Sequence, residues 1–153
     1  KMISKKRTSI KTNQSHIKVV IAGCGNYGRN LAITLAESGK EVIIIEKNRE
    51  KLESLSKLSI QNDLIVGFLG DVTISEDLLE IDIGTADLFI ATTGSDSVNA
   101  LAAQKIKLMY GVDDVICIMS DVSKQKLYES LGIRIVNHTE IAIQSLIDSS
   151  LES

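Results

Sequence analysis

A glycine-rich turn between a strand-like and a helix-like segment constrains the fold of this chain most. Residues 17–22 form a short run of mostly β-branched apolar side chains, and residues 26–38 carry apolar positions typical of a helix that stops at Gly39. The residues that join them, Gly23-Cys24-Gly25-Asn26-Tyr27-Gly28, follow the pattern G-x-G-x-x-G. A match in this strand–turn–helix context is much stronger than an isolated one and predicts a dinucleotide-binding unit.

The rest of the chain alternates strand-like and helix-like segments in the same way. Short apolar runs rich in β-branched residues predict five further strands, at 42–45, 64–69, 87–91, 115–119 and 133–136. Stretches with helical spacing of apolar residues predict helices at 49–58, 98–110, 122–131 and 140–151. This alternation predicts an α/β protein with a Rossmann-like, doubly wound, mainly parallel six-stranded sheet.

The length of 153 residues fits one domain, but the charge is unevenly distributed. Residues 1–18 hold six of the 17 basic residues and no acidic one, so the remainder carries 11 − 20 = −9. We expect a basic, flexible arm over residues 1–16 and a nucleotide-binding domain over residues 17–153. The arm is interpreted as a solubilising tail, with attraction to anionic lipid or nucleic acid as the alternative.

Composition argues against several other classes of protein. No apolar run approaches the roughly 18 residues that a membrane helix needs, and the N-terminus lacks the apolar segment of a secretory signal. The two cysteines, Cys24 and Cys117, can form neither a disulfide framework nor a four-cysteine zinc site. Aromatic residues make up only 3%, which disfavours base stacking, so no nucleic acid partner is predicted.

Each glycine of the motif has a physical role in nucleotide binding. Gly23 permits a tight turn, Gly25 lets the backbone approach a pyrophosphate, and Gly28 lets the helix pack closely on the sheet. The N-terminus of the helix then offers free amides and a positive dipole end to the phosphates. The alternative is a tight turn that holds no ligand.

Glu46 ends the second predicted strand, 46 − 28 = 18 residues after the motif. A dinucleotide fold places an acidic residue there, on the ribose hydroxyls of adenosine. A carboxylate would repel a 2′-phosphate, so NAD(H) or an adenosine phosphate is predicted over NADP(H). Lys47 and Arg49 lie close enough to weaken this preference, and an ordinary solvated strand end remains the alternative.

The sequence contains little that suggests catalysis. No lysine stands four residues after a tyrosine, as a short-chain dehydrogenase would require, and His138 is interpreted as a surface or capping residue. Cys24 could act as a redox sensor, but a small residue in a tight loop is favoured. Acidic residues between 76 and 82 are interpreted as a solvated helix face. No catalytic residue and no metal site is therefore predicted.

Later motifs make the chain resemble a known family. Gly70-Asp71-Val72-Thr73 follows the third predicted strand, the segment from Ala86 to Thr93 includes the fourth, and Asp96 and Asn99 come next. With the glycine motif, this combination is similar to the RCK N-terminal domain, also called the Trk/Ktr N or KTN domain, over about residues 17–151. The resemblance implies that Asp71 and Val72 flank an adenine, and that Thr92, Thr93 and Gly94 line the cleft beyond the phosphates. Gly23, Cys24, Gly25, Asn26, Tyr27, Gly28, Glu46 and Lys47 complete the expected cofactor-binding set.

The same resemblance implies a function. Members of the family are cytosolic subunits or domains that bind NAD(H), ATP or ADP, form dimers and rings, and control potassium channels or transporters at the inner face of the membrane. AMP is a further candidate ligand. The alternative function is an NAD-dependent oxidoreductase or its isolated cofactor domain. This chain departs from the family by lacking an arginine within the glycine motif and near the end of the fifth strand, where Ile118 and Met119 stand. A C-terminal regulatory lobe, frequent in the family, is expected to be absent, separate or cut away.

The last predicted helix has more apolar positions than a narrow core-facing stripe requires. We expect part of that surface to be exposed unless a partner covers it, and the resemblance implies that the helix crosses to a neighbouring subunit. The alternative is that these side chains complete the core of the domain itself. The positions concerned are Ile141, Ile143, Leu146, Ile147 and Leu151.

Overall fold

The structure is a computed structural model that describes residues 16–58 and 62–152. The expected basic arm therefore lies outside the described residues, apart from His16, whose Nδ1 lies 2.8 Å from the carbonyl oxygen of Gly39.

Six parallel strands form one sheet in the order β3-β2-β1-β4-β5-β6. This order and the helices between the strands confirm the predicted Rossmann-like, doubly wound fold. The strands are β1 (Lys18–Ala22), β2 (Glu41–Glu46), β3 (Ile65–Leu69), β4 (Leu88–Ala91), β5 (Val115–Ile118) and β6 (Ile133–Val136). The helices are α1 (Asn26–Glu37), α2 (Arg49–Leu58), α3 (Ser75–Glu80), the 3₁₀ turn η1 (Ile83–Thr85), α4 (Asp96–Leu108), α5 (Gln125–Ser130) and α6 (His138–Leu151).

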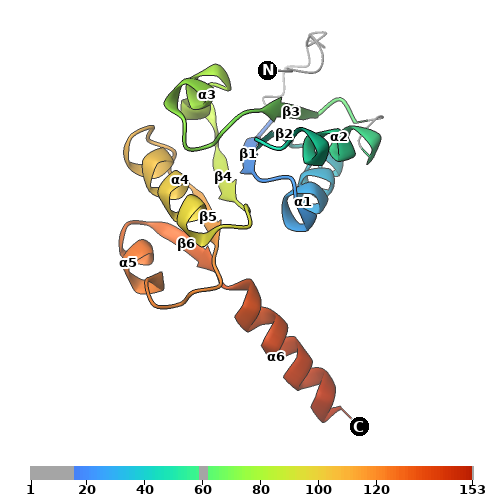
Figure 1. The fold of residues 1–153 in the computed structure, drawn as a ribbon, viewed down its shortest axis with the longest axis vertical. Coiled ribbons are helices and arrows are strands. Elements are labelled where there is room, and N and C mark those ends of the chain that lie inside the picture. The colour runs from blue at the N-terminus through green and yellow to red at the C-terminus, as the bar shows by residue number, and fades with distance from the viewer. Residues whose placement is uncertain (1–15, 59–61, 153) are drawn as a thin grey trace.

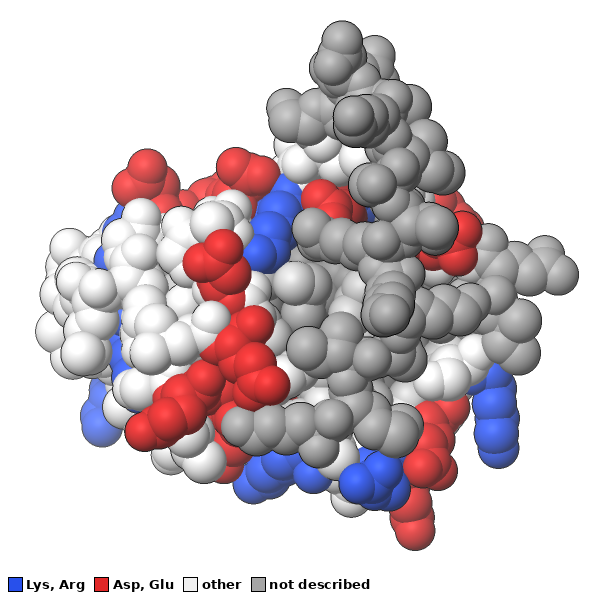
Figure 2. Space-filling view, turned by 90° about the horizontal axis from the view of Figure 1, so that it is seen from above, with Lys and Arg blue, Asp and Glu red and all other residues white. Residues whose placement is uncertain are grey.

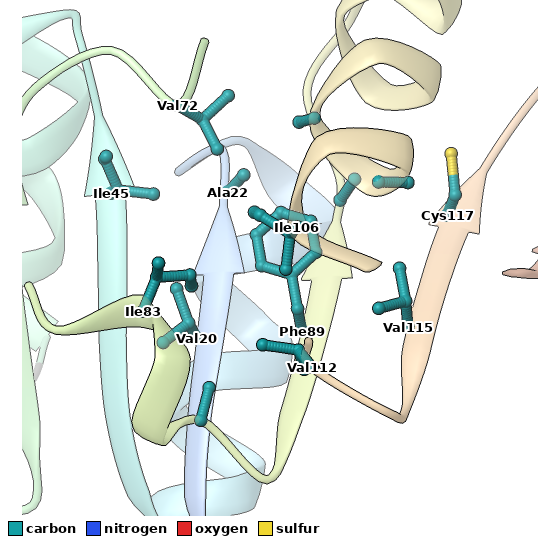
Figure 3. Packing of buried hydrophobic residues seen from close by; sticks show 14 of the residues in the cluster. Val20, Ala22, Ile45, Val72, Ile83, Phe89, Ile106, Val112, Val115 and Cys117 are labelled. Carbon is teal, nitrogen blue, oxygen red and sulfur yellow. The ribbon is translucent and has the colours of Figure 1, made fainter. Parts of the chain in front are cut away.

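Helices cover both faces of the sheet (Figure 1). Alternate side chains of the strands supply two separate cores, one on each face. Val19 and Ile21 of β1 belong to the core that α1 and α2 cover. Val20 of β1 belongs to the other core, in which Phe89 of β4 lies beside Ile106 of α4 (Figure 3). The strands are short and mostly apolar because both faces are covered.

Polar caps explain why two helices begin earlier than the apolar pattern indicates. The side chain of Ser95 accepts a hydrogen bond from the amide of Val98, so α4 begins at Asp96 rather than at residue 98. The side chain of Asn137 likewise caps α6 by accepting from the amide of Glu140 at 2.9 Å. Both caps satisfy amides that the helix itself leaves unpaired.

The segment between β3 and β4 holds the short helix α3 and the turn η1, which the periodicity did not delimit. The Nζ of Lys18 donates to the carbonyl oxygens of Ile81 and Asp82, both at 3.1 Å, and so ties the end of this segment to the start of β1. One prediction here is partly wrong: Asp77, interpreted as part of a solvated face, is 7% exposed.

Helix α6 projects away from the body of the domain (Figure 1). None of its residues is buried, and its five large apolar side chains, from Ile141 to Leu151, are 46–78% exposed. The expected exposure is therefore confirmed, and the alternative that these side chains complete the domain's own core is wrong. Within the described ranges, no helix is both long and apolar enough to span a bilayer.

Charged side chains of both signs are interspersed on the face shown in Figure 2. The described Lys and Arg side chains on that face lie among Asp and Glu side chains and form no continuous basic surface (Figure 2).

Candidate functional site

The candidate site lies at the carboxyl edge of the sheet, where β1 and β4 are neighbours. The helix that follows β1 packs on one face of the sheet and the helix that follows β4 packs on the other. The loops after the two strands therefore diverge, and open α/β sheets bind ligands in the crevice that this divergence creates.

The turn after β1 requires glycine at two of its three motif positions. Gly23 has a φ of +99°, and a Cβ atom there would lie 2.9 Å from the amide nitrogen of Thr93. A Cβ atom at Gly28 would lie 1.9 Å from the carbonyl oxygen of Gly23, so any side chain would force α1 away from the turn. A Cβ atom at Gly25 would meet nothing within 4 Å, so the chain is open to an incoming group at this point.

The first turn of α1 presents backbone donors beside this opening. The amide of Arg29 donates to the carbonyl oxygen of Gly25 at 3.0 Å. The amides of Asn26, Tyr27 and Gly28 precede this bond and therefore have no acceptor within the helix. The first turn contains no acidic residue that would compensate the positive end of the helix dipole. These amides can therefore bind an anion such as a phosphate.

Glu46 is fixed next to the glycine turn by two backbone hydrogen bonds. Its Oε1 accepts from the amide of Cys24 and its Oε2 from the amide of Asn48, both at 2.9 Å, and its side chain is 9% exposed. Each carboxylate oxygen can accept a second hydrogen bond, so the group can still receive the hydroxyls of a ribose.

The side chain of Cys24 turns away from the candidate site. It is fully buried, and its Sγ donates to the carbonyl oxygen of Lys51 at 3.3 Å. Burial first, and then the neighbouring Glu46, raise the pKa of this thiol to about 11. A thiol with so high a pKa is a poor nucleophile at neutral pH, which favours the interpretation of Cys24 as a small structural residue.

The loop after β3 is held by a network of carboxylates. Asp71 accepts hydrogen bonds from the amide and the hydroxyl of Thr73 at 2.8 and 2.6 Å, and the hydroxyl bond is the main cause that lowers the pKa of Asp71. The exposed Lys47 lowers it further, so the two side chains interact across the ends of β2 and β3. The amide of Asp71 donates to the buried carboxylate of Asp77 at 2.8 Å. These bonds fix the loop that was expected to flank an adenine.

Val72 takes part in this loop differently from Asp71. Its side chain is 6% exposed and points into the core beside Ala22 (Figure 3). The Nζ of Lys105 on α4 donates to the next carbonyl oxygen, that of Thr73, at 3.0 Å. The loop is therefore anchored on its core side by Val72 and Lys105, while Asp71 remains partly exposed at the strand end.

Thr92, Thr93 and Gly94 form the opposite side of the crevice. The hydroxyl of Thr92 donates to the carbonyl oxygen of Ala22 at 2.9 Å and so joins the ends of β4 and β1. Gly94 has open space at its Cβ position, as Gly25 has.

Asn99 holds Thr93 in place from α4. Its Oδ1 accepts from both the amide and the hydroxyl of Thr93, at 2.9 and 2.6 Å, and its Nδ2 donates to the carbonyl oxygens of Thr93 and Ile118 at 3.0 and 3.2 Å. Its side chain is 1% exposed. Asn99 thus connects the ends of β4 and β5. The sequence drew attention to this residue only through the resemblance, without a role.

The structure therefore brings most of the predicted positions into one continuous arrangement. Glu46 touches the glycine turn through Cys24, the turn touches Thr92 and Thr93, and Lys47 interacts with Asp71. Sequence reasoning missed Asp77 and the contact of His138 with Tyr27, whose ring centroids lie 5.4 Å apart. Of the two roles predicted for His138, surface or capping residue, the capping role is wrong, since Asn137 caps α6, and the residue is half-buried.

Comparison with known proteins assigns this chain to a family. The sequence model of the TrkA-N domain matches residues 19–139. The chain belongs to the TrkA-N family. A Trk system potassium uptake protein TrkA homolog of Archaeoglobus fulgidus is 38% identical over 93 residues, which are 59% of this chain and 20% of that protein. The TrkA protein of Streptomyces coelicolor is 30% identical over 115 residues, or 75% of this chain and 50% of that protein. This chain thus matches half or less of the length of these relatives.

Solved structures of the same fold include another TrkA-N domain. The TrkA-N domain of the inner membrane protein ybaL from Escherichia coli has a TM-score of 0.76 at 15% identity, covering 90% of this chain and 98% of that one. The GsuK channel bound to NAD has a TM-score of 0.68 at 17% identity, covering 85% and 23%. The Kef C-terminal domain of Shewanella denitrificans in its AMP-bound form has a TM-score of 0.66 at 17% identity, covering 88% and 80%. At these identities the likeness establishes the fold of this TrkA-N domain.

Proposed function

We propose that this TrkA-N domain binds an adenine nucleotide and regulates a membrane potassium transporter or channel. The observation that carries the proposal is the open glycine turn at Gly25, with the first amides of α1 on one side and the fixed carboxylate of Glu46 on the other. The amides suit a phosphate and the carboxylate suits a ribose diol.

The proposed ligand is NAD(H), with ADP, ATP and AMP as the alternatives. Structures of the same fold are described as bound to NAD and AMP, which supports a nucleotide ligand in general. The first turn of α1 places Asn26 and Tyr27 where an arginine would serve a triphosphate, which favours a ligand with less charge at the phosphates. All the proposed cofactor-binding residues, from Gly23 to Gly94, lie at the same edge of the sheet.

The proposed partners are a second copy of this chain and an integral-membrane potassium transport protein. Helix α6 exposes five large apolar side chains, which is costly in water and is relieved when a neighbouring subunit covers them. Curated relatives named as potassium uptake proteins support the choice of membrane partner. The proposed location is therefore cytoplasmic, at the inner face of the membrane through that partner.

A regulator of this kind acts by shifting an equilibrium between conformations. Nucleotide binding changes the assembly only if the two conformations bind the nucleotide with different affinities. No proton donor or substrate site is required for such a role.

One titration series tests the proposal against the alternative of an NAD-dependent oxidoreductase. NADH, ADP, ATP and AMP are titrated into the purified chain by calorimetry at fixed salt, and NADH oxidation is followed in parallel with a panel of small carbonyl substrates. We expect saturable binding of at least one nucleotide and no hydride transfer. Turnover of NADH would favour the oxidoreductase, and absence of binding by all four nucleotides would contradict the proposed function.

A further inference from the structure

A contact between two aromatic rings connects the candidate nucleotide site to helix α6. Tyr27 occupies the second variable position of the glycine motif, in the first turn of α1, and its side chain is 54% exposed. His138 is the first residue of α6. The centroids of the two rings lie 5.4 Å apart with an interplanar angle of 54°, within the range of favourable aromatic pairs.

Helix α6 has few other means of holding its direction. None of its residues is buried, and its cap, the buried Asn137, bonds the first turn of the same helix rather than the glycine turn. The ring pair is therefore placed to set the angle at which α6 leaves the domain.

His138 is not anchored through its Nδ1 to the described residues. Its Nδ1 is buried and has no hydrogen-bond partner within the described part of the chain. A buried nitrogen without a partner is unfavourable, so Nδ1 does not anchor the imidazole, and the contact with Tyr27 is one of ring packing. A shift of Tyr27 that moves this ring would therefore break no hydrogen bond of Nδ1 to the described residues.

The geometry amplifies such a shift. A phosphate bound at the first turn of α1 would contact the amides of Tyr27 and its neighbours, next to the ring pair. Helix α6 has 14 residues, so at 1.5 Å per residue it is about 21 Å long. A small rotation at His138 therefore produces a displacement of several ångströms at the far end, where the exposed apolar side chains lie.

We infer that the Tyr27–His138 ring contact couples nucleotide occupancy of the glycine turn to the orientation of α6. This inference rests on the proposed nucleotide binding and adds the residues that transmit it. Coupling between two sites is reciprocal. A partner that binds one orientation of α6 therefore changes nucleotide affinity by the same factor by which the nucleotide changes the affinity for that partner.

Hydrogen–deuterium exchange of the α6 amides, with and without saturating nucleotide, tests the inference. The variants are His138→Ala, which removes the ring, and His138→Phe, which keeps a ring without nitrogens. Thr139→Ala is the matched control, since Thr139 is an exposed neighbour on the same helix. Nucleotide affinity of every protein is measured by calorimetry, and its oligomeric state by light scattering at the same concentration.

We expect nucleotide to change exchange in α6 by about fivefold or more in the parent, Thr139→Ala and His138→Phe proteins. In His138→Ala we expect the nucleotide to bind and the change in α6 to fall below twofold. An undiminished response in His138→Ala, or its loss in His138→Phe as well, would overturn the role of the ring contact. So would a parent that binds nucleotide without any response in α6. A parent that binds no nucleotide would instead refute the proposed function, and this inference with it.

Discussion

Glu46 is the residue at which charge can select between nucleotides. Its nearly buried carboxylate is fixed by the amides of Cys24 and Asn48, so it cannot swing away from a 2′-phosphate without leaving both amides unpaired. Loss of the charged ribose contact together with repulsion should cost about 1.5–3 kcal/mol. We predict a dissociation constant for NADPH about 10 to 150 times that for NADH.

Calorimetric titration with both nucleotides measures this ratio, and Glu46→Gln should reduce it because the charge is removed. Thermal unfolding of the variant provides the control for its fold. Equal dissociation constants for NADH and NADPH in the parent would refute the role of Glu46 and point to Lys47 or Arg49 as compensating cations.

Gly28 and Gly25 differ in the space that surrounds them, which gives a matched pair of substitutions. In Gly28→Ala the added methyl would lie 1.9 Å from the carbonyl oxygen of Gly23, and backbone cannot move aside cheaply. We predict a loss of about 1–3 kcal/mol or more in the free energy of unfolding, measured in urea. Gly25→Ala, where the methyl meets open space, should cost less, about 0.5–1 kcal/mol, because Gly25 caps α1 and alanine is a poorer cap. Equal stability of the two variants would mean that α1 is not packed closely on the turn.

At the scale of elements, Asn99 connects the ends of β4 and β5 to α4. Replacing it with alanine leaves the amide of Thr93 and the carbonyl oxygen of Ile118 without these bonds, and we predict a loss of about 1–3 kcal/mol in the free energy of unfolding. Asn30→Ala is the control, because Asn30 is exposed on α1 and bonds only within its own helix. A variant at Asn99 as stable in urea as that control would show that the network contributes nothing to stability.

The elements of this fold could be predicted from the sequence because their signals are local. Apolar runs such as residues 42–45 are typical of strands covered on both faces, and the structure has β2 at Glu41–Glu46. The starts of α4 and α6 were misplaced by two residues because their caps, Ser95 and Asn137, act through hydrogen bonds rather than through periodicity. The limits of α3 were not predicted, and α5 was predicted at 122–131 rather than at Gln125–Ser130, because six residues give too short a pattern.

The candidate site could be predicted in part for a similar reason. The glycine motif and Glu46 occupy fixed spacings along the chain, so their proximity follows from the fold. The burial of Asp77 and the pairing of Tyr27 with His138 depend on how the chain packs in three dimensions, and no local pattern predicts them.

At the scale of the whole molecule, α6 gives the domain a surface for self-association. We predict that the parent forms a dimer or larger assembly at micromolar concentration, because burying five large apolar side chains from each copy is favourable. Leu146→Glu should weaken this assembly, since Leu146 is 67% exposed and the change places a charge on the proposed interface. Ser149→Glu, which adds the same charge at an exposed polar position of α6, is the matched control.

Multi-angle light scattering across a concentration series measures the assembly, with a chain truncated after Asn137 as a further comparison. The truncated chain should be monomeric, and it should keep its fold because α6 contributes no buried residue. A parent that stays monomeric at every concentration would refute self-association. A truncated chain that remains dimeric would place the interface on another element.

Nucleotide binding at the glycine turn is the central claim, and one calorimetric comparison tests it most directly. The parent and Gly25→Val are titrated with the nucleotide that the parent binds best, after circular dichroism has established that both are folded. Because nothing lies within 4 Å of the Cβ position of Gly25, valine should be accommodated by the domain and should block only the approach of the phosphates. We predict saturable binding by the parent and none by the variant. A folded Gly25→Val protein that binds the nucleotide as tightly as the parent would show that the site lies elsewhere.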